Sequence, residues 1–180
     1  MIKKRDDMKS EEVISFSKSI IDRIIEMPQF IQSEFIMAYV NFGNEVITID
    51  LINQCFAMGK KVYVPSIIKT YGNKKEIVAS KISDLSNLVK GEYGIYGPSL
   101  QSLKAIDPKD LDFIVVPGVV FDIYKNRIGF GKGYYDRFLV QTSLKCYKIG
   151  LAFESQICES IPTDKHDYPL NAIATEKRII

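Results

Sequence analysis

Two apolar runs of strand length constrain the fold of this chain more than any other feature. One run covers residues 35–40 (Phe-Ile-Met-Ala-Tyr-Val), and the other lies within residues 112–116 (Asp-Phe-Ile-Val-Val) and ends at Pro117-Gly118. Strands that are apolar on both faces are typical of a parallel sheet covered by helices on each side. The two runs therefore predict buried strands in such a sheet.

Helical patterns alternate with strand patterns along the chain. Apolar residues recur at helical spacing in residues 10–27, 47–58 and 134–140, and Ser10 is the predicted N-cap of the first helix. Further strands are predicted at residues 61–65, 76–82, 146–153 and 172–174. This alternation predicts one α/β domain over residues 1–180, a three-layer sandwich around a mostly parallel sheet.

Composition excludes several classes of function. The net charge is only +2 in 180 residues, so we expect no nucleic-acid partner, and no apolar run approaches the ~18 residues of a membrane span. The three cysteines are widely spaced, which predicts reduced thiols and a cytoplasmic protein. His166 is the only histidine, so the sequence excludes a multi-histidine metal site.

A glycine-rich segment is the main candidate for chemistry. It reads Arg127-Ile128-Gly129-Phe130-Gly131-Lys132-Gly133-Tyr134-Tyr135-Asp136 and leads directly into a helical pattern. Glycines let backbone amides approach an anion closely, and Lys132 can neutralise phosphate oxygens. The spacing fits neither a Walker A motif nor a dinucleotide fingerprint. The segment is thus a phosphate-loop candidate of another kind.

The residues alone leave alternatives open at this segment. The glycines could simply connect a hairpin to a helix, with Lys132 in solvent. Tyr134 and Tyr135 could offer a stacking surface for a flat heterocycle, or Tyr135 could pack into the core with Phe138 and Leu139.

Together with Pro117-Gly118-x-x-Phe121-Asp122, this segment closely resembles the 5-formyltetrahydrofolate cyclo-ligase family, and its Gly-Lys-Gly-Tyr-Tyr-Asp core is highly specific to it. The resemblance covers nearly the whole chain, including Asn44-Glu45, residues 59–65 and residues 161–176. It implies a fold like the NagB/RpiA/CoA-transferase proteins. It also implies conversion of 5-formyltetrahydrofolate to 5,10-methenyltetrahydrofolate, with ATP going to ADP and phosphate.

The resemblance also implies residue roles. ATP would be bound by Arg127, Ile128, Gly129, Phe130, Gly131, Lys132, Gly133, Tyr134 and Tyr135. Of these, Arg127, Lys132 and Tyr134 would take part in catalysis. Folate would contact Val40, Glu45 and Phe130 to Tyr134, and Mg²⁺ would be held by Asp136 and Asp167. From the residues alone, Val40 could equally be core, Glu45 a first-turn glutamate and Asp167 a turn residue.

Two departures from the family pattern stand out. Basic residues that contact ATP in the family fall before Met1 when the chains are aligned at Ser10-Glu11-Glu12, so Lys3, Lys4 or Arg5 would have to substitute. In residues 93–98, Gly97 stands where the family usually has a glutamate before proline.

The alternatives are a phosphate-sugar isomerase or CoA transferase on a related fold, and a folate- or nucleotide-binding module without catalysis. We expect a monomer or a weak homodimer.

Overall fold

A six-stranded sheet forms the centre of the molecule. The computed structural model describes residues 2–70, 72, 74–91 and 96–180. The strands lie in the order β11-β9-β6-β1-β2-β3. Their bounds are β1 Phe35–Met37, β2 Lys61–Lys69, β3 Lys75–Ile82, β6 Phe113–Val116, β9 Tyr147–Leu151 and β11 Ala172–Ala174. All pairings are parallel except that of β2 with β3, so the predicted mostly parallel sheet is confirmed.

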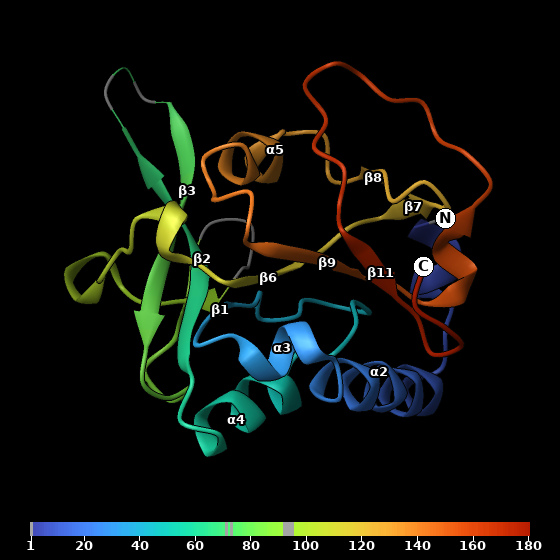
Figure 1. The fold of residues 1–180 in the computed structure, drawn as a ribbon, viewed down its shortest axis with the longest axis horizontal. Helices are drawn as coiled ribbons and strands as arrows, with labels where there is room; N and C mark the ends of the chain where they lie inside the picture. Colours follow the sequence, from blue (N-terminus) through green and yellow to red (C-terminus); the bar gives the residue numbers. More distant parts are fainter. Residues whose placement is uncertain (1, 71, 73, 92–95) are drawn as a thin grey trace.

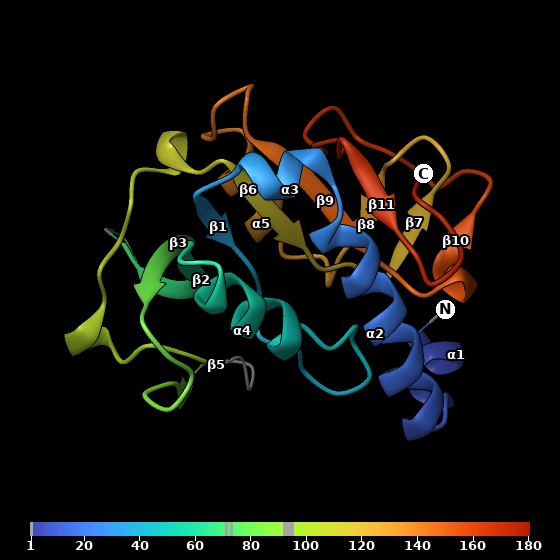
Figure 2. The ribbon, with the colours of Figure 1, turned by 60° about the horizontal axis from the view of Figure 1, so that its bottom comes forward.

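Helices and a small second sheet cover the two faces of this sheet (Figures 1 and 2). One face carries α2 (Ser10–Ile25), α3 (Pro28–Gln32) and α4 (Ile49–Ala57). The other carries α5 (Tyr134–Leu139) and the three-stranded sheet of β7 (Val120–Asp122), β8 (Arg127–Ile128) and β10 (Ile157–Cys158). These layers form the predicted three-layer arrangement.

The apolar strands build a core on each face. Along β6, Phe113 and Val115 pack with the cluster beneath α2 and α4, whereas Ile114 and Val116 pack with the cluster beneath α5. Successive side chains of a strand point to opposite faces, so a continuous apolar run is what a sheet covered on both faces requires.

Most predicted elements are present, with shifted ends. The helix predicted at 10–27 is α2, but Ser10 is its first helical residue and Lys9 is the N-cap, so the predicted cap was wrong. The Lys9 backbone N–H donates to Glu12 Oε2 (3.1 Å). This contact comes from the third helical residue, as in a capping box.

The hairpin of β2 and β3 was the largest miss. The prediction ended the strand at Pro65, yet β2 continues to Lys69 and pairs with all of β3. The pairing of β1 with β2 ends at Tyr63, so beyond that residue this edge of β2 has no β1 partner. A proline there therefore costs no hydrogen bond to β1.

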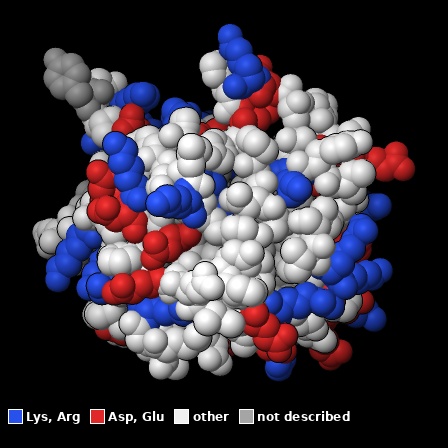
Figure 3. Space-filling view, viewed as in Figure 1, with Lys and Arg blue, Asp and Glu red and all other residues white. Residues whose placement is uncertain are grey.

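Shorter elements complete the chain. They are α1 (Ile2–Asp6), β4 (Val89–Lys90), β5 (Tyr96–Gly97) and the 3₁₀ turns Leu100–Ser102, Pro108–Asp110 and Glu154–Gln156. Acidic and basic side chains are interspersed over the face in Figure 3. No helix in the described part of the chain is long and apolar enough to cross a membrane.

Candidate active site

A cleft of about 550 Å³ lies at the carboxyl edge of the central sheet. β1 leads into Tyr39 and Val40, and β6 leads into Pro117, and all three residues line the cleft. Open α/β sheets bind ligands outside the carboxyl ends of their strands. The hairpin of β2 and β3 adds Ile67 and Ile77 to the wall, so the inner surface is mainly apolar.

The glycine-rich segment forms one whole side of this cleft. Every residue from Arg127 to Asp136 lines it. Gly131 (φ 77°) and Gly133 (φ 60°) adopt left-handed backbone conformations, which side chains disfavour. Gly133 is also the N-cap of α5. The glycines are therefore needed for the path of the loop from β8 into α5.

A buried ion pair fixes the base of the loop. Arg127 Nη2 lies 2.9 Å from Asp136 Oδ1, and the two side chains are 4% and 19% exposed. The Arg127 guanidinium also lies over the Tyr135 ring, 5.5 Å from its centroid. Burial lowers the pKa of Arg127, and the Asp136 carboxylate partly opposes this shift. The pair therefore joins the two ends of the loop at an electrostatic cost.

The tip of the loop is more open. Lys132 is exposed, and its backbone carbonyl accepts a hydrogen bond from Arg137 Nη1 (3.0 Å). Arg137 also stacks over the Tyr134 ring at 5.3 Å. Arg137 thus holds the loop backbone and Tyr134, while Lys132 lines the cleft and stays exposed.

Tyr135 takes part in both predicted environments. It lines the cleft and packs against the core cluster beneath α5. Its hydroxyl is buried without a hydrogen-bond partner, and burial raises its pKa well above the usual value. An unpaired buried hydroxyl is costly, so this group is available to a bound ligand.

Glu45, in the segment between β1 and α4, also lines the cleft. Its Oε2 accepts a hydrogen bond from the Phe42 backbone N–H (3.0 Å). Burial raises the pKa of this carboxyl, and the Phe42 N–H and Arg5 act in the opposite direction. An acid with a spare acceptor oxygen thus lies among apolar residues.

Two carboxylates near the loop suit a hard cation. Asp136 and Asp167 both line the cleft. Asp136 Oδ1 accepts from Arg127 and from the Tyr168 backbone N–H (3.4 Å), and Asp167 Oδ2 accepts from the Asp164 N–H (2.6 Å). Within the described part of the chain, each keeps a second oxygen without such a bond, which fits Mg²⁺ bound by few carboxylates plus phosphate and water. No group of three or more metal-binding side chains occurs in the described residues.

The structure does not place the three predicted N-terminal residues in the cleft. Lys3 and Lys4 are exposed on α1 and Arg5 is buried, and none is among the described residues that line the cleft. His166 is exposed. Of the segment 93–98, residues 93–95 lie outside the described residues. A Cβ on Gly97 would meet Ser66 Oγ at 3.3 Å, so a larger residue there needs Ser66 to shift.

Six cleft residues were missed by sequence reasoning: Tyr39, Phe42, Pro65, Ile67, Ile77 and Pro117. The rule that ligands bind at carboxyl edges could have found Tyr39 and Pro117, since both follow predicted strands. No sequence pattern marked Ile67 and Ile77 as cleft residues, because their place in the cleft wall depends on the extension of β2 beyond Pro65.

The fold and the cleft define an α/β protein whose glycine-rich loop lies beside an apolar pocket. Comparison with known proteins makes this specific. The profile of the 5-formyltetrahydrofolate cyclo-ligase family matches residues 1–176. The chain belongs to this family.

Named relatives agree. The chain is 31% identical to a probable 5-formyltetrahydrofolate cyclo-ligase of Schizosaccharomyces pombe, covering 92% of this chain and 86% of the relative. It is 33% identical to a protein of the same name from Caenorhabditis elegans, covering 94% and 86%. The solved structure of Aquifex aeolicus 5,10-methenyltetrahydrofolate synthetase matches with a TM-score of 0.84 and 33% identity, over 99% of this chain and 87% of that one.

Proposed function

We propose that this cleft carries out the reaction of the family, the ATP-dependent cyclisation of 5-formyltetrahydrofolate to 5,10-methenyltetrahydrofolate. One observation carries the assignment. The glycine-rich loop, Val40, Glu45 and Asp167 are far apart in sequence but line a single cleft. A phosphate donor and a flat folate ring can therefore meet in one cleft.

The loop from Arg127 to Tyr135 binds ATP in this proposal. Backbone amides between Gly129 and Gly133 approach the phosphates, and Lys132 neutralises the oxygens of the transferred group. Tyr134, held by Arg137, presents its ring beside the phosphates. Arg127 holds Asp136 and Tyr135 in place at the base of the loop. The protein thus contributes position and charge.

The chemistry follows from the substrate. The formyl oxygen is a poor leaving group, so it first attacks the γ-phosphorus of ATP and ADP departs. The N10 nitrogen of the folate then attacks the activated carbon and gives its proton to solvent, the ring closes and the oxygen leaves as phosphate. Lys132 compensates charge at the transferred phosphoryl group, and the apolar cleft wall keeps water from the activated carbon.

Mg²⁺ is the metal that we propose for the carboxylates of Asp136 and Asp167. When bound, it neutralises charge on the ATP phosphates. The two carboxylates belong to α5 and to the loop before β11, so both flank the glycine loop.

The folate occupies the other part of the cleft. Val40 and the apolar hairpin residues pack against the ring, and Glu45 accepts hydrogen bonds from the amino-pyrimidine edge. Phe130 to Tyr134 border the folate from the loop side. Lys3 and Lys4 are exposed on α1 and do not line the cleft. We propose that they contribute to ATP binding indirectly, by way of this helix.

Further parts of the proposal concern the whole protein. We propose one functional domain over residues 1–180, a monomer or weak homodimer, and a cytoplasmic location. The three free cysteines, two of them buried, support a reducing compartment.

The test is the absorbance band of methenyl-folate after mixing protein, 5-formyltetrahydrofolate and Mg²⁺, with and without ATP. We expect the band to grow only with ATP. Folate binding without product would favour the non-catalytic module, and neither binding nor product would favour an enzyme acting on a phosphate sugar.

A further inference from the structure

Arg5 of α1 carries a buried charge that its surroundings do not match. The residue is 6% exposed, and neither its Nε nor its Nη1 has a hydrogen-bond partner. Among the described residues, its ion pair is with Asp6: Nε lies 3.7 Å from Asp6 Oδ1, and the Asp6 side chain is 55% exposed. Burying a guanidinium without good partners is costly, so we expect the buried Arg5 to have a function that offsets this cost.

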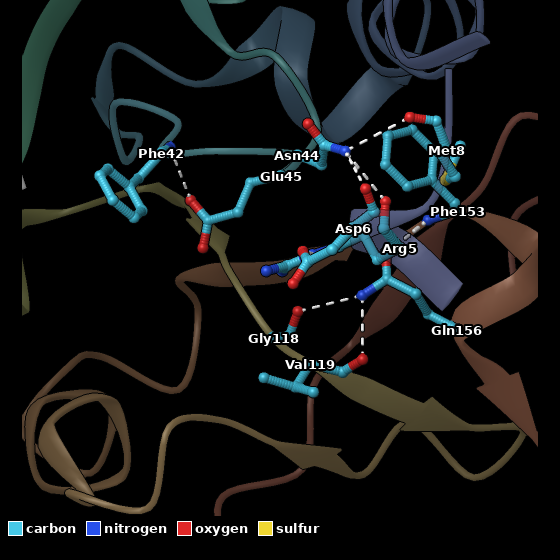
Figure 4. Close-up of polar contacts among 10 residues, drawn as sticks. All are labelled: Arg5, Asp6, Met8, Phe42, Asn44, Glu45, Gly118, Val119, Phe153 and Gln156. Carbon is cyan, nitrogen blue, oxygen red and sulfur yellow. Dashed lines mark hydrogen bonds and ion pairs between the residues drawn. The ribbon is translucent and has the colours of Figure 1, made fainter. Parts of the chain in front are cut away.

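A neighbour of Glu45 fastens α1 in place. The Asn44 side-chain amide donates to the carbonyl oxygens of Arg5 (3.1 Å), Asp6 (3.1 Å) and Met8 (3.5 Å). Figure 4 shows the Arg5 side chain extending from α1 between Glu45 and the segment Gly118–Val119. The contact that fixes α1 therefore also sets the guanidinium beside the next residue, Glu45.

Glu45 requires a nearby positive charge to stay ionised. It lines the apolar cleft, and burial is the main influence that raises its pKa, while Arg5 lowers it. The phenols of Tyr39 and Tyr135 also face this carboxyl, and both stay neutral because burial raises their pKa values. In the described residues, Arg5 is the positive charge that acts on Glu45.

We propose that Arg5 is a positioning residue for the substrate, which keeps Glu45 ionised at the folate end of the cleft instead of binding ATP. This inference rests on the proposed function. An ionised Glu45 only accepts hydrogen bonds, which matches the adjacent N–H groups of an amino-pyrimidine edge. A protonated Glu45 would turn an O–H donor toward those N–H groups and weaken binding.

The experiment measures the Kd of 5-formyltetrahydrofolate by calorimetry without ATP, from about pH 6 to about pH 8.5. The proteins are wild type, Arg5→Met, Arg5→Lys, Glu45→Gln and the double variant Arg5→Met/Glu45→Gln. Lys9→Met is the matched control, because it removes an exposed positive charge close by in the chain. Thermal unfolding at each pH verifies that every variant is folded.

The sign of the effect follows from Glu45. Without Arg5 its pKa rises further, so a smaller fraction of Glu45 is ionised at the acidic end of the range. Arg5→Met therefore binds folate about tenfold more weakly than wild type near pH 6 and recovers as pH rises. Arg5→Lys and Lys9→Met keep the wild-type profile. Glu45→Gln binds weakly at every pH, and adding Arg5→Met to it causes no further pH dependence.

Several results would overturn the inference. A weakening in Arg5→Met that is equal at all pH values indicates a merely structural role. An unchanged folate Kd with a weaker ATP Kd would assign Arg5 to the nucleotide. Both results keep the proposed function if wild type still forms methenyl-folate, whereas a wild type that binds no folate overturns both proposals.

Discussion

Replacing Arg127 by methionine tests how the phosphate loop is held. The change removes the guanidinium that lies 2.9 Å from Asp136 and keeps a chain of similar length. Burial lowers the pKa of Arg127 more than Asp136 raises it, so the pair is expensive to bury. Its net stabilisation is small, but losing one partner leaves an uncompensated charge inside the protein.

The magnitude follows from exposure. Removing one partner of a buried pair costs about 3–5 kcal/mol. Asp136 keeps 19% exposure and the Tyr168 N–H, so we expect the lower end, about 3 kcal/mol. For a chain of this size that corresponds to a Tm lower by about 6–12 °C. Asp136→Asn leaves the guanidinium without its partner and has a similar cost. The double variant is less destabilised than the sum of the two single variants, by about 2 kcal/mol.

Urea unfolding of the wild type, both single variants and the double variant gives the coupling energy. Lys145→Met is the control, since this lysine is exposed and lies outside the loop, and we expect it to cost less than about 1 kcal/mol. If the two single effects simply add, with a coupling below about 0.5 kcal/mol, the buried pair does not hold the loop and the reasoning is wrong.

Three further outcomes are expected. Lys132→Ala lowers kcat/KM for ATP-dependent methenyl-folate formation by about a hundredfold or more, with an unchanged Tm because the side chain is exposed; near-normal kinetics would exclude its phosphate role. Tyr135→Phe removes an unpaired buried hydroxyl, so urea unfolding of the free protein shows equal or higher stability, and a loss above about 1 kcal/mol would reveal a partner. Burial raises the pKa values of the Cys55 and Cys146 thiols to about 12, so a disulfide reagent near neutral pH labels only Cys158 in the folded protein and all three after unfolding; rapid labelling of all three would contradict this.

The central sheet was predictable because its strands are apolar on both faces. Phe113 to Val116 could not face solvent on either side, so the folded protein had to cover both faces of this strand. The β2–β3 hairpin was not predictable in the same way. Its second half depends on where β1 stops, which is a property of the neighbouring strand and not of the residues around Pro65.

The motif residues divide into those that line the cleft and those that shape it. Gly118 packs against the Phe121 ring, where an added Cβ would collide. Asp122 accepts hydrogen bonds from the backbone N–H groups of Tyr124 (3.0 Å) and Asn126 (2.9 Å), in the turn that leads into β8. The spacing Pro117-Gly118-x-x-Phe121-Asp122 thus has a structural cause. The turn at Asp122 directs β8 so that Arg127 can donate a hydrogen bond to Asp136.

Arg5 illustrates why part of the site needed the structure. Aligning basic residues by sequence placed Lys3, Lys4 and Arg5 in one group, because each carries the same charge near the same end of the chain. The fold separates them. The Asn44 amide donates to carbonyl oxygens at the end of α1, and in this position of the helix Arg5 is buried whereas Lys3 and Lys4 are exposed. Carbonyl acceptors exist at every residue, so this contact leaves no residue-type signal at positions 3–8. The charge that acts on Glu45 could therefore be found only once α1 had been placed against the loop after β1.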